Sequence, residues 1–139
     1  MVVIQRDGAA LALTVASGTD GRRSVRLSRF DDSGRSLLSE EPMAGTDVLL
    51  KVVGNYLSYS FQFSVDGKQW SRVGPVVDGT LLSPAVLHGF NYTGVFVGLY
   101  ASANGLPTSN HADFAWFQYE ATAQNRDAWY RRIRTPGPK

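Results

Sequence analysis

The feature that most constrains this chain is a strict alternation of apolar and polar residues from position 57 to position 65. The apolar side chains stand at every second position, and they are Leu57, Tyr59, Phe61, Phe63 and Val65. A period of two places them all on one face of a β-strand. Asp66-Gly67 follows directly and is typical of a two-residue hairpin loop, which would lead to a partner strand over residues 69–73. The sequence therefore predicts a sheet with one buried face.

Three further regions carry strand signals. Residues 2–4 and 10–15 flank Asp7-Gly8, a favoured turn pair, and therefore predict a hairpin. Residues 25–30 alternate in the same way, and the apolar run at 48–53 is short enough to favour a buried strand over a helix. The first half of the chain is therefore predicted to be β-structure.

Polar segments separate these strands. Residues 31–46 are rich in Ser, Asp, Glu, Gly and Pro, which predicts a surface connection with one short strand at 36–38. A turn is predicted at Gly54-Asn55. Four basic residues around the predicted strand at 25–30 form a positive patch, and they are Arg22, Arg23, Arg26 and Arg29. We interpret this patch as the solvated, charge-protected face of an edge strand in preference to a binding surface.

Two segments, at 92–102 and 112–120, are predicted to be the strands around which the core is organised. The first carries apolar side chains on one face, and Gly94 and Gly98 lie on the other face, which favours close packing. The second carries aromatic side chains on both faces, as expected where two sheets meet, and they are Phe114, Trp116, Phe117 and Tyr119. We therefore predict an all-β, antiparallel two-sheet sandwich with less than about a tenth of its residues in helices.

Length and charge limit the classes of function. The 139 residues fit one sandwich domain, at 1–121, followed by a basic tail at 122–139. The tail holds five of the 14 basic residues, and the net charge of +2 is too small to predict a nucleic-acid partner. No apolar run reaches the roughly 20 residues of a membrane helix, so we expect no membrane span. The start lacks the layout of a signal peptide, and the sequence leaves the compartment open.

The titratable residues do not form a catalytic or metal-binding pattern. Asp31-Asp32 and Glu40-Glu41 are adjacent pairs whose side chains point apart in an extended chain, whereas catalysis by a pair of carboxyl groups needs both to face one substrate bond. His88 and His111 lack the spacing of transition-metal ligands. We expect no catalytic residue and no cofactor, with calcium near Asp113 as the one ion that loop oxygens would suit.

Three sequence pieces resemble a known family. They are YSFQFSVDGKQW at 59–70, YTGVFVGLY at 92–100 and ADFAWFQYE at 112–120. In this order they resemble the C-terminal β-sandwich of family 43 glycoside hydrolases, the β-xylosidases and α-L-arabinofuranosidases. That module is a jelly roll of the concanavalin A-like type. The resemblance covers 48–120 well and the first 30 residues weakly. The family's sandwich starts several strands earlier, so either the start is a truncation or the domain is a reduced relative that lacks N-terminal strands. If the start is natural, we expect the chain to self-associate near residues 1–15.

The resemblance implies an accessory function. Family members carry their catalytic carboxylates in a separate upstream propeller, so this chain alone is not expected to be an enzyme but to be part of a hydrolase acting on xylan or arabinoxylan. The implied partners are the catalytic propeller and a xylan- or arabinan-type saccharide. A family loop that closes the substrate pocket resembles residues 81–92 here, where Phe90 or Tyr92 would supply the aromatic ring beside His88 and Asn91.

The alternative is a free-standing carbohydrate-binding module for plant cell-wall polysaccharide. Such a module holds sugar rings against exposed aromatic side chains. Besides the two loop aromatics, the candidates for this contact are Tyr56, Trp70 and Tyr100.

Overall fold

The computed structural model describes residues 1–18, 20–83, 94–103, 105, 107–109 and 111–121. The chain divides into two compact units, Met1–Tyr100 and Ala101–Lys139, and each is described separately. In the described part of the chain, no helix has the length and apolar character needed to cross a membrane.

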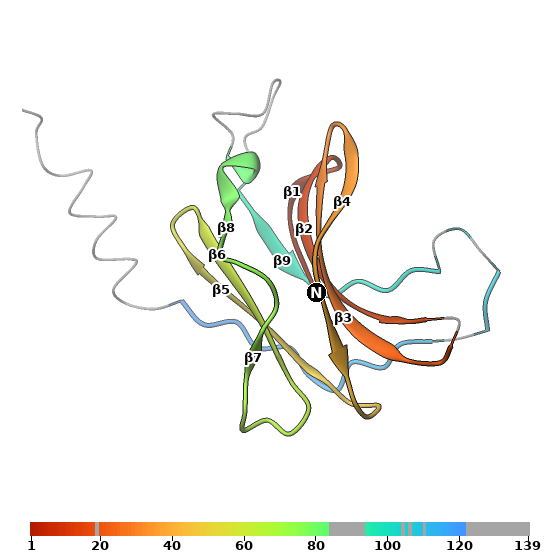
Figure 1. Cartoon of the computed structure of the whole chain (residues 1–139). Coiled ribbons are helices and arrows are strands. Elements are labelled where there is room, and N and C mark those ends of the chain that lie inside the picture. The colour runs from red at the N-terminus through yellow and green to blue at the C-terminus, as the bar shows by residue number, and fades with distance from the viewer. Residues whose placement is uncertain (19, 84–93, 104, 106, 110, 122–139) are drawn as a thin grey trace, which may run out of the picture. The chain divides into compact units, whose positions relative to one another are not determined.

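The first sheet has five antiparallel strands in the order β4-β3-β2-β1-β9 (Figure 1). Its strands are β1 (Val2–Arg6), β2 (Ala9–Ser17), β3 (Arg23–Asp31), β4 (Gly34–Met43) and β9 (Phe96–Gly98). The predicted first hairpin is confirmed, since β1 and β2 pair on either side of Asp7-Gly8 and Gly8 takes a φ of 75°. The strand predicted at 25–30 is confirmed within β3.

The second sheet has four strands and is centred on the alternating segment. Its strands are β5 (Leu49–Asn55), β6 (Ser58–Ser64), β7 (Ser71–Arg72) and β8 (Val77–Asp78). β5 lies on one side of β6, while β7 and β8 pair in succession with the other side (Figure 1). Phe61 and Phe63 are buried as the alternation predicts. A single 3-10 turn, η1 (Gly79–Leu82), follows β8.

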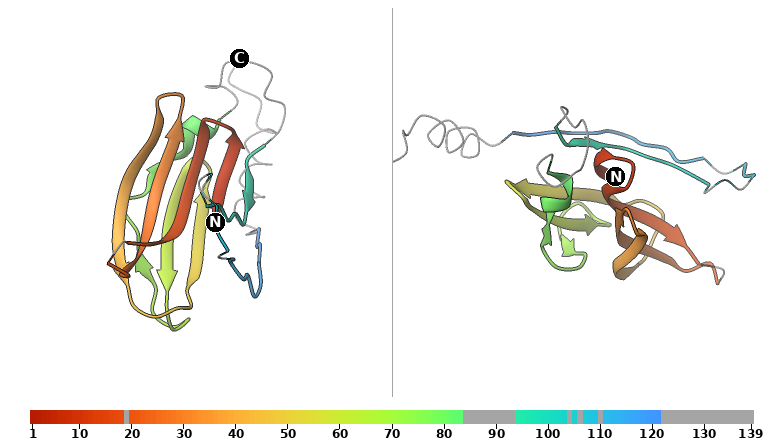
Figure 2. Two further views of the ribbon diagram at one scale, coloured as in Figure 1. Left: turned by 90° about the vertical axis from the view of Figure 1, so that its right-hand side faces the viewer. Right: turned by 90° about the horizontal axis from the view of Figure 1, so that it is seen from above.

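The two sheets face each other across one hydrophobic core. Their strands run in roughly the same direction, as in aligned sandwiches (Figure 2). The buried members of the core are Val3, Ala9, Leu11, Leu13, Val25, Leu27, Met43, Phe61, Phe63, Val73, Val77 and Leu82. Burying one large apolar side chain contributes about 1.5–3 kcal/mol, so this cluster is the main source of stability. The prediction of an antiparallel two-sheet sandwich is confirmed.

The prediction of a surface connection over residues 31–46 is wrong, although the short strand predicted at 36–38 is confirmed as part of a longer strand. Residues 34–43 form β4, which pairs with β3 from Asp31 opposite Gly34 to Arg23 opposite Met43. Most of β4 is solvent-exposed because it is the edge strand of the sheet, which explains its polar composition. The backbone ladder with β3 therefore overrides the loop-like composition.

The turn predicted at Gly54-Asn55 lies two residues further along the chain. Gly54 pairs with Tyr59 and Asn55 with Ser58, so the two-residue loop is Tyr56-Leu57. Gly54 allows close packing against Tyr59 and does not form the turn, since a Cβ placed on it would lie 3.2 Å from the Tyr59 ring.

Asp66-Gly67 does not close a two-residue hairpin as predicted. β7 begins at Ser71, and the wider loop is held by the Asp66 carboxylate. Its Oδ1 accepts hydrogen bonds from the backbone N–H groups of Lys68 (2.8 Å) and Gln69 (2.9 Å). Aspartate often stabilises a turn in this way, and here it selects a longer loop than the dipeptide predicts.

The prediction that residues 92–102 and 112–120 form the central strands is wrong. In the first, the described residues 94–102 contribute only the three-residue β9, at the edge of its sheet. Residues 112–120 form no strand, and none of them belongs to the described core. The core forms instead where β2 and β3 face β6, because each of those strands offers one apolar face to the other sheet.

Candidate functional site

The loop predicted to close a substrate pocket leaves the sandwich at a fixed turn. Asp78, the last residue of β8, caps η1, since its Oδ1 accepts a hydrogen bond from the Thr80 N–H at 2.9 Å. The side chain of Leu82, at the end of η1, is buried in the core. The chain therefore departs at Ser83 from a turn that is held both by a cap and by core packing.

The Tyr59 ring fixes η1 against β6. A Cβ placed on Gly79 would lie 2.3 Å from Tyr59 Cε2, so the backbone of η1 lies directly on the ring. The Gly79 N–H also donates a hydrogen bond to the Leu57 carbonyl oxygen at 2.6 Å. Gly54 contacts the same ring from β5. A larger residue than glycine at position 79 would separate η1 from the sheet.

On the C-terminal side of the predicted loop, the described chain enters the first sheet as β9. This strand pairs with β1, with Val97 opposite Val3, and Val97 packs against the core. Both the exit and the return of the predicted loop are thus anchored on the sandwich. The loop residues proposed for function, His88, Phe90, Asn91 and Tyr92, lie outside the described residues, and their role stays a prediction.

The two adjacent carboxylate pairs take part in local contacts. Their partners are Ser33 and Arg29 for Asp31, Arg6 for Asp32, Arg26 for Glu40 and Ser39 for Glu41. Hydrogen bonds from Ser33 hold the pKa of Asp31 below its ordinary value, and hydrogen bonds from Ser24 and Arg26 do the same for the pKa of Glu40. A general acid for glycoside hydrolysis needs a raised pKa, whereas the pKa values of Asp31 and Glu40 are lowered.

No group of three potential metal ligands gathers anywhere in the part of the chain that the structure describes. Asp113, considered for calcium, lies 3.4 Å from His111 Nε2, and both side chains are exposed. Calcium takes about six to eight oxygen ligands. Of these oxygen ligands, the pair of His111 and Asp113 supplies one carboxylate.

The three candidate aromatics for sugar stacking differ in their surroundings. Tyr56 lies at the tip of the β5–β6 hairpin with a φ of 54°, a left-handed conformation that is uncommon for a bulky residue, and its side chain is exposed. Tyr100 is also exposed. Trp70 is half-buried, and Lys51 Nζ lies 3.7 Å from the centre of its ring. That ammonium group already covers one face of Trp70.

Four aromatic side chains that the sequence placed where two sheets meet are exposed. Their fractional exposure ranges from 46% to 72%, and they are Phe114, Trp116, Phe117 and Tyr119. The sequence contained a signal for this exposure, namely aromatic residues on both faces of the segment, because a strand that is apolar on both faces needs cover on both sides. The described residues give this segment no strand partner.

The fold defines the class of protein as an antiparallel two-sheet β-sandwich domain. Residues 1–120 match the family described as the beta-xylosidase C-terminal concanavalin A-like domain. The chain therefore belongs to this family, which confirms the resemblance to the C-terminal sandwich of family 43 glycoside hydrolases.

Two curated relatives match parts of the chain. The non-reducing end alpha-L-arabinofuranosidase BoGH43B of Bacteroides ovatus is 28% identical over 119 residues, which are 86% of this chain and 20% of the relative. The xylan 1,3-beta-xylosidase of a Vibrio species is 35% identical over 65 residues, which are 44% of this chain and 11% of the relative. The matched regions thus span a small part of each relative.

Proposed function

We propose that this chain is the non-catalytic accessory β-sandwich of a family 43 glycoside hydrolase acting on xylan or arabinoxylan. It supports a separate catalytic propeller and helps to complete the active site of that propeller. The observation that carries the proposal is the match of residues 1–120 to a C-terminal domain family. The names of the two relatives, an arabinofuranosidase and a xylosidase, support the substrate class.

The geometry around the predicted loop supports the way in which the sandwich would act. Capped η1 and the buried Leu82 fix the exit of the chain, and β9 fixes its return on the edge of the first sheet. A loop held at both ends can carry an aromatic ring to a substrate at little entropic cost. Phe90 or Tyr92 would then cover one face of a sugar and exclude water, which orients the substrate without adding chemistry.

A replacement experiment tests this proposal. The segment of the Bacteroides ovatus enzyme that matches this chain would be deleted in one variant and replaced by residues 1–139 in another. We expect the deletion to lower kcat/KM for an arabinofuranoside and the replacement to restore a substantial part of it. A replaced enzyme that folds, by its melting curve, but is no more active than the deletion variant would contradict the proposal.

The alternative, a free-standing carbohydrate-binding module, makes a different prediction. Such a module binds polysaccharide without a catalytic partner. Isothermal titration of the isolated chain with neutral xylan and arabinan oligosaccharides separates the two functions. We expect no heat of binding from these neutral sugars. Saturable binding by the isolated chain would favour the module.

A further inference from the structure

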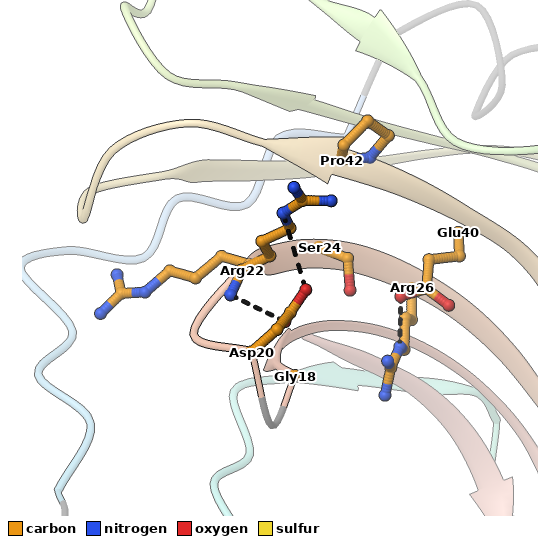
Figure 3. Close-up of a pocket in the computed structure, with 8 residues that line it drawn as sticks. Gly18, Asp20, Arg22, Ser24, Arg26, Glu40 and Pro42 are labelled. Carbon is orange, nitrogen blue, oxygen red and sulfur yellow. Dashed lines mark hydrogen bonds and ion pairs between the residues drawn. The ribbon is translucent and has the colours of Figure 1, made fainter.

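A groove of about 290 Å³ opens beside the turn that joins β2 to β3 (Figure 3). The turn is tight, since the Gly18 N–H donates to the Arg22 carbonyl oxygen at 2.8 Å. It places Asp20 against Gly18, where an added Cβ would lie 2.6 Å from the carboxylate oxygen Asp20 Oδ1. On the strands, Arg26 of β3 stands opposite Glu40 of β4. The backbone therefore brings charged side chains of both signs to one place.

The groove holds more positive than negative charge. Arg26 Nε lies 2.9 Å from Glu40 Oε1, and Arg22 Nε lies 3.6 Å from Asp20 Oδ2. Dashed lines mark these ion pairs in Figure 3. The third guanidinium, on Arg23, donates to a neutral partner, the Thr46 carbonyl oxygen, at 3.1 Å. Three guanidinium groups thus face two carboxylates, and one positive charge is unmatched among the lining residues.

Arg22 is the guanidinium best placed to meet a ligand. Its side chain is 90% exposed, and its contact with Asp20 is the longer of the two ion pairs. An exposed ion pair of this length stabilises the fold very little, so little is lost if the guanidinium turns to another carboxylate. Arginine binds carboxylates and phosphates through two parallel N–H···O bonds, so Arg22 suits a ligand with an anionic oxygen group.

We propose that this groove binds the carboxylate of an acidic saccharide, a uronic acid unit. The volume of about 290 Å³ lies just below the roughly 300–1,000 Å³ of ligand pockets, which limits the ligand to a single sugar ring. One unmatched positive charge suits one carboxylate. Ser24, Asp20 and Glu40 supply further oxygen atoms that can accept hydrogen bonds from ring hydroxyls.

The same charges disfavour an acidic peptide. A peptide with several carboxylates would bring its additional charges close to Asp20 and Glu40, which repel them. Hydrogen bonding by Ser24 and Arg26 holds the pKa of Glu40 below its ordinary value, so this residue stays charged at neutral pH. The saccharide class follows from membership of a glycoside hydrolase domain family and does not depend on the accessory role proposed above.

Titration of the whole chain with two matched sugars tests the proposal. Methyl glucuronide and methyl glucoside differ by one carboxylate, and backbone amide shifts in nuclear magnetic resonance spectra report weak binding. We expect the glucuronide to bind at least about tenfold more tightly, as a charge-assisted contact implies, and to shift the amides of residues 20–26. Added salt should weaken the binding. Equal affinity for the two sugars, or shifts confined to other residues, would overturn the proposal.

Three variants locate the site. Arg22→Gln and Arg23→Gln should each weaken glucuronide binding severalfold, while Arg29→Gln should leave it unchanged, because Arg29 pairs with Asp31 at 2.9 Å outside the groove. Arg22 is so exposed that its variant should keep the wild-type melting temperature. If neither groove variant weakens binding, or if a tetraglutamate peptide binds more tightly than the glucuronide, the groove is not a saccharide site. Since all of these residues lie within 18–42, failure here leaves the proposal for residues 81–92 standing.

Discussion

The hairpin strands of the first unit and the segment 111–121 are both rich in apolar residues, but they are buried to very different extents. Leu11 and Leu27, in β2 and β3, are fully buried between the two sheets. Trp116 and Tyr119, in the second unit, are 62% and 72% exposed. Composition alone does not distinguish the two regions.

The difference lies in how many faces each segment must bury. β2 and β3 present leucine and valine on the core-facing side, which the opposing sheet covers. Their other side carries mostly small or polar residues, of which Ala10, Ala12 and Ser28 are also buried, so only one side needs cover for large apolar groups. Residues 112–120 carry aromatic rings on both sides and would need cover on both. We expect a segment of this kind to be covered by the partner that the accessory role requires, because exposed apolar patches mark interaction surfaces.

The largest expected loss of stability comes from a substitution in the buried hairpin strands of the first unit. Leu27→Ala removes a side chain with no exposed surface from the middle of the core. We expect it to lower the free energy of unfolding by about 2–5 kcal/mol, measured by urea denaturation. Leu37→Ala, the same change at an exposed position of the neighbouring β4, is the matched control and should cost less than about 1 kcal/mol. Equal losses in the two variants would remove the distinction between the core and the surface.

A smaller loss is expected where η1 meets β6. Gly79→Ala places a methyl group 2.3 Å from the Tyr59 ring, so the two elements must separate, at a cost of about 1–3 kcal/mol. Gly94→Ala is the control, because its Cβ would have no atom within 4 Å. Thermal melts compare the two variants. An unchanged melting temperature for Gly79→Ala would show that η1 is not held against the ring.

Acid should weaken the turns of the sandwich gradually. Backbone N–H groups of Gln69 and Lys68 hold the pKa of Asp66 below its ordinary value of 3.8, and Thr80 lowers the pKa of Asp78 in the same way. A carboxylate whose pKa is lowered by folding stabilises the folded state fully at pH values above its ordinary pKa. This stability is lost as the pH falls towards and through the lowered pKa of the folded state. We expect the free energy of unfolding to decline below about pH 5. Asp66→Asn should reduce that decline, as urea denaturation between pH 3 and pH 6 would reveal.

The smallest change in stability is expected from a substitution in the exposed segment 111–121. Trp116→Ala should change the free energy of unfolding by less than about 1 kcal/mol, since more than half of the ring is already in water. Urea denaturation of the isolated chain measures this change. A loss of several kcal/mol would mean that the ring is buried in solution and that the contrast with Leu27 does not hold.

Much of the fold was predictable from sequence because the responsible signals are local. Turn chemistry at Asp7-Gly8 and the alternation before Asp66 identified the first hairpin and the central strand of the second sheet. β4 was predicted only at residues 36–38, because the rest of the strand depends on pairing with β3, to which its own polar sequence gives no clue. The exposure of the aromatics was missed because periodicity shows which side chains are apolar and not what covers them.

The candidate site was predictable to a lesser degree. Family resemblance pointed to the loop at 81–92, and the structure adds the anchors at Leu82 and β9 on either side of it. The arginine patch was interpreted from the sequence as the solvated face of an edge strand, which is wrong about the strand, since β3 lies between β4 and β2. The groove of the patch depends on the register that sets Arg26 opposite Glu40 and on the tight turn at Gly18, and neither can be read from the order of the residues.

The most direct test of the accessory role is to remove the loop's rings in the enzyme that carries residues 1–139 in place of its own matching segment. Phe90→Ala and Tyr92→Ala should leave the melting temperature of the isolated chain nearly unchanged, with less than about 1 kcal/mol lost. In the fused enzyme we expect at least one of them to lower kcat/KM by about tenfold or more, because the substrate loses an orienting contact. Wild-type kcat/KM in both variants, or a loss of several kcal/mol in stability with kcat/KM intact, would contradict the account.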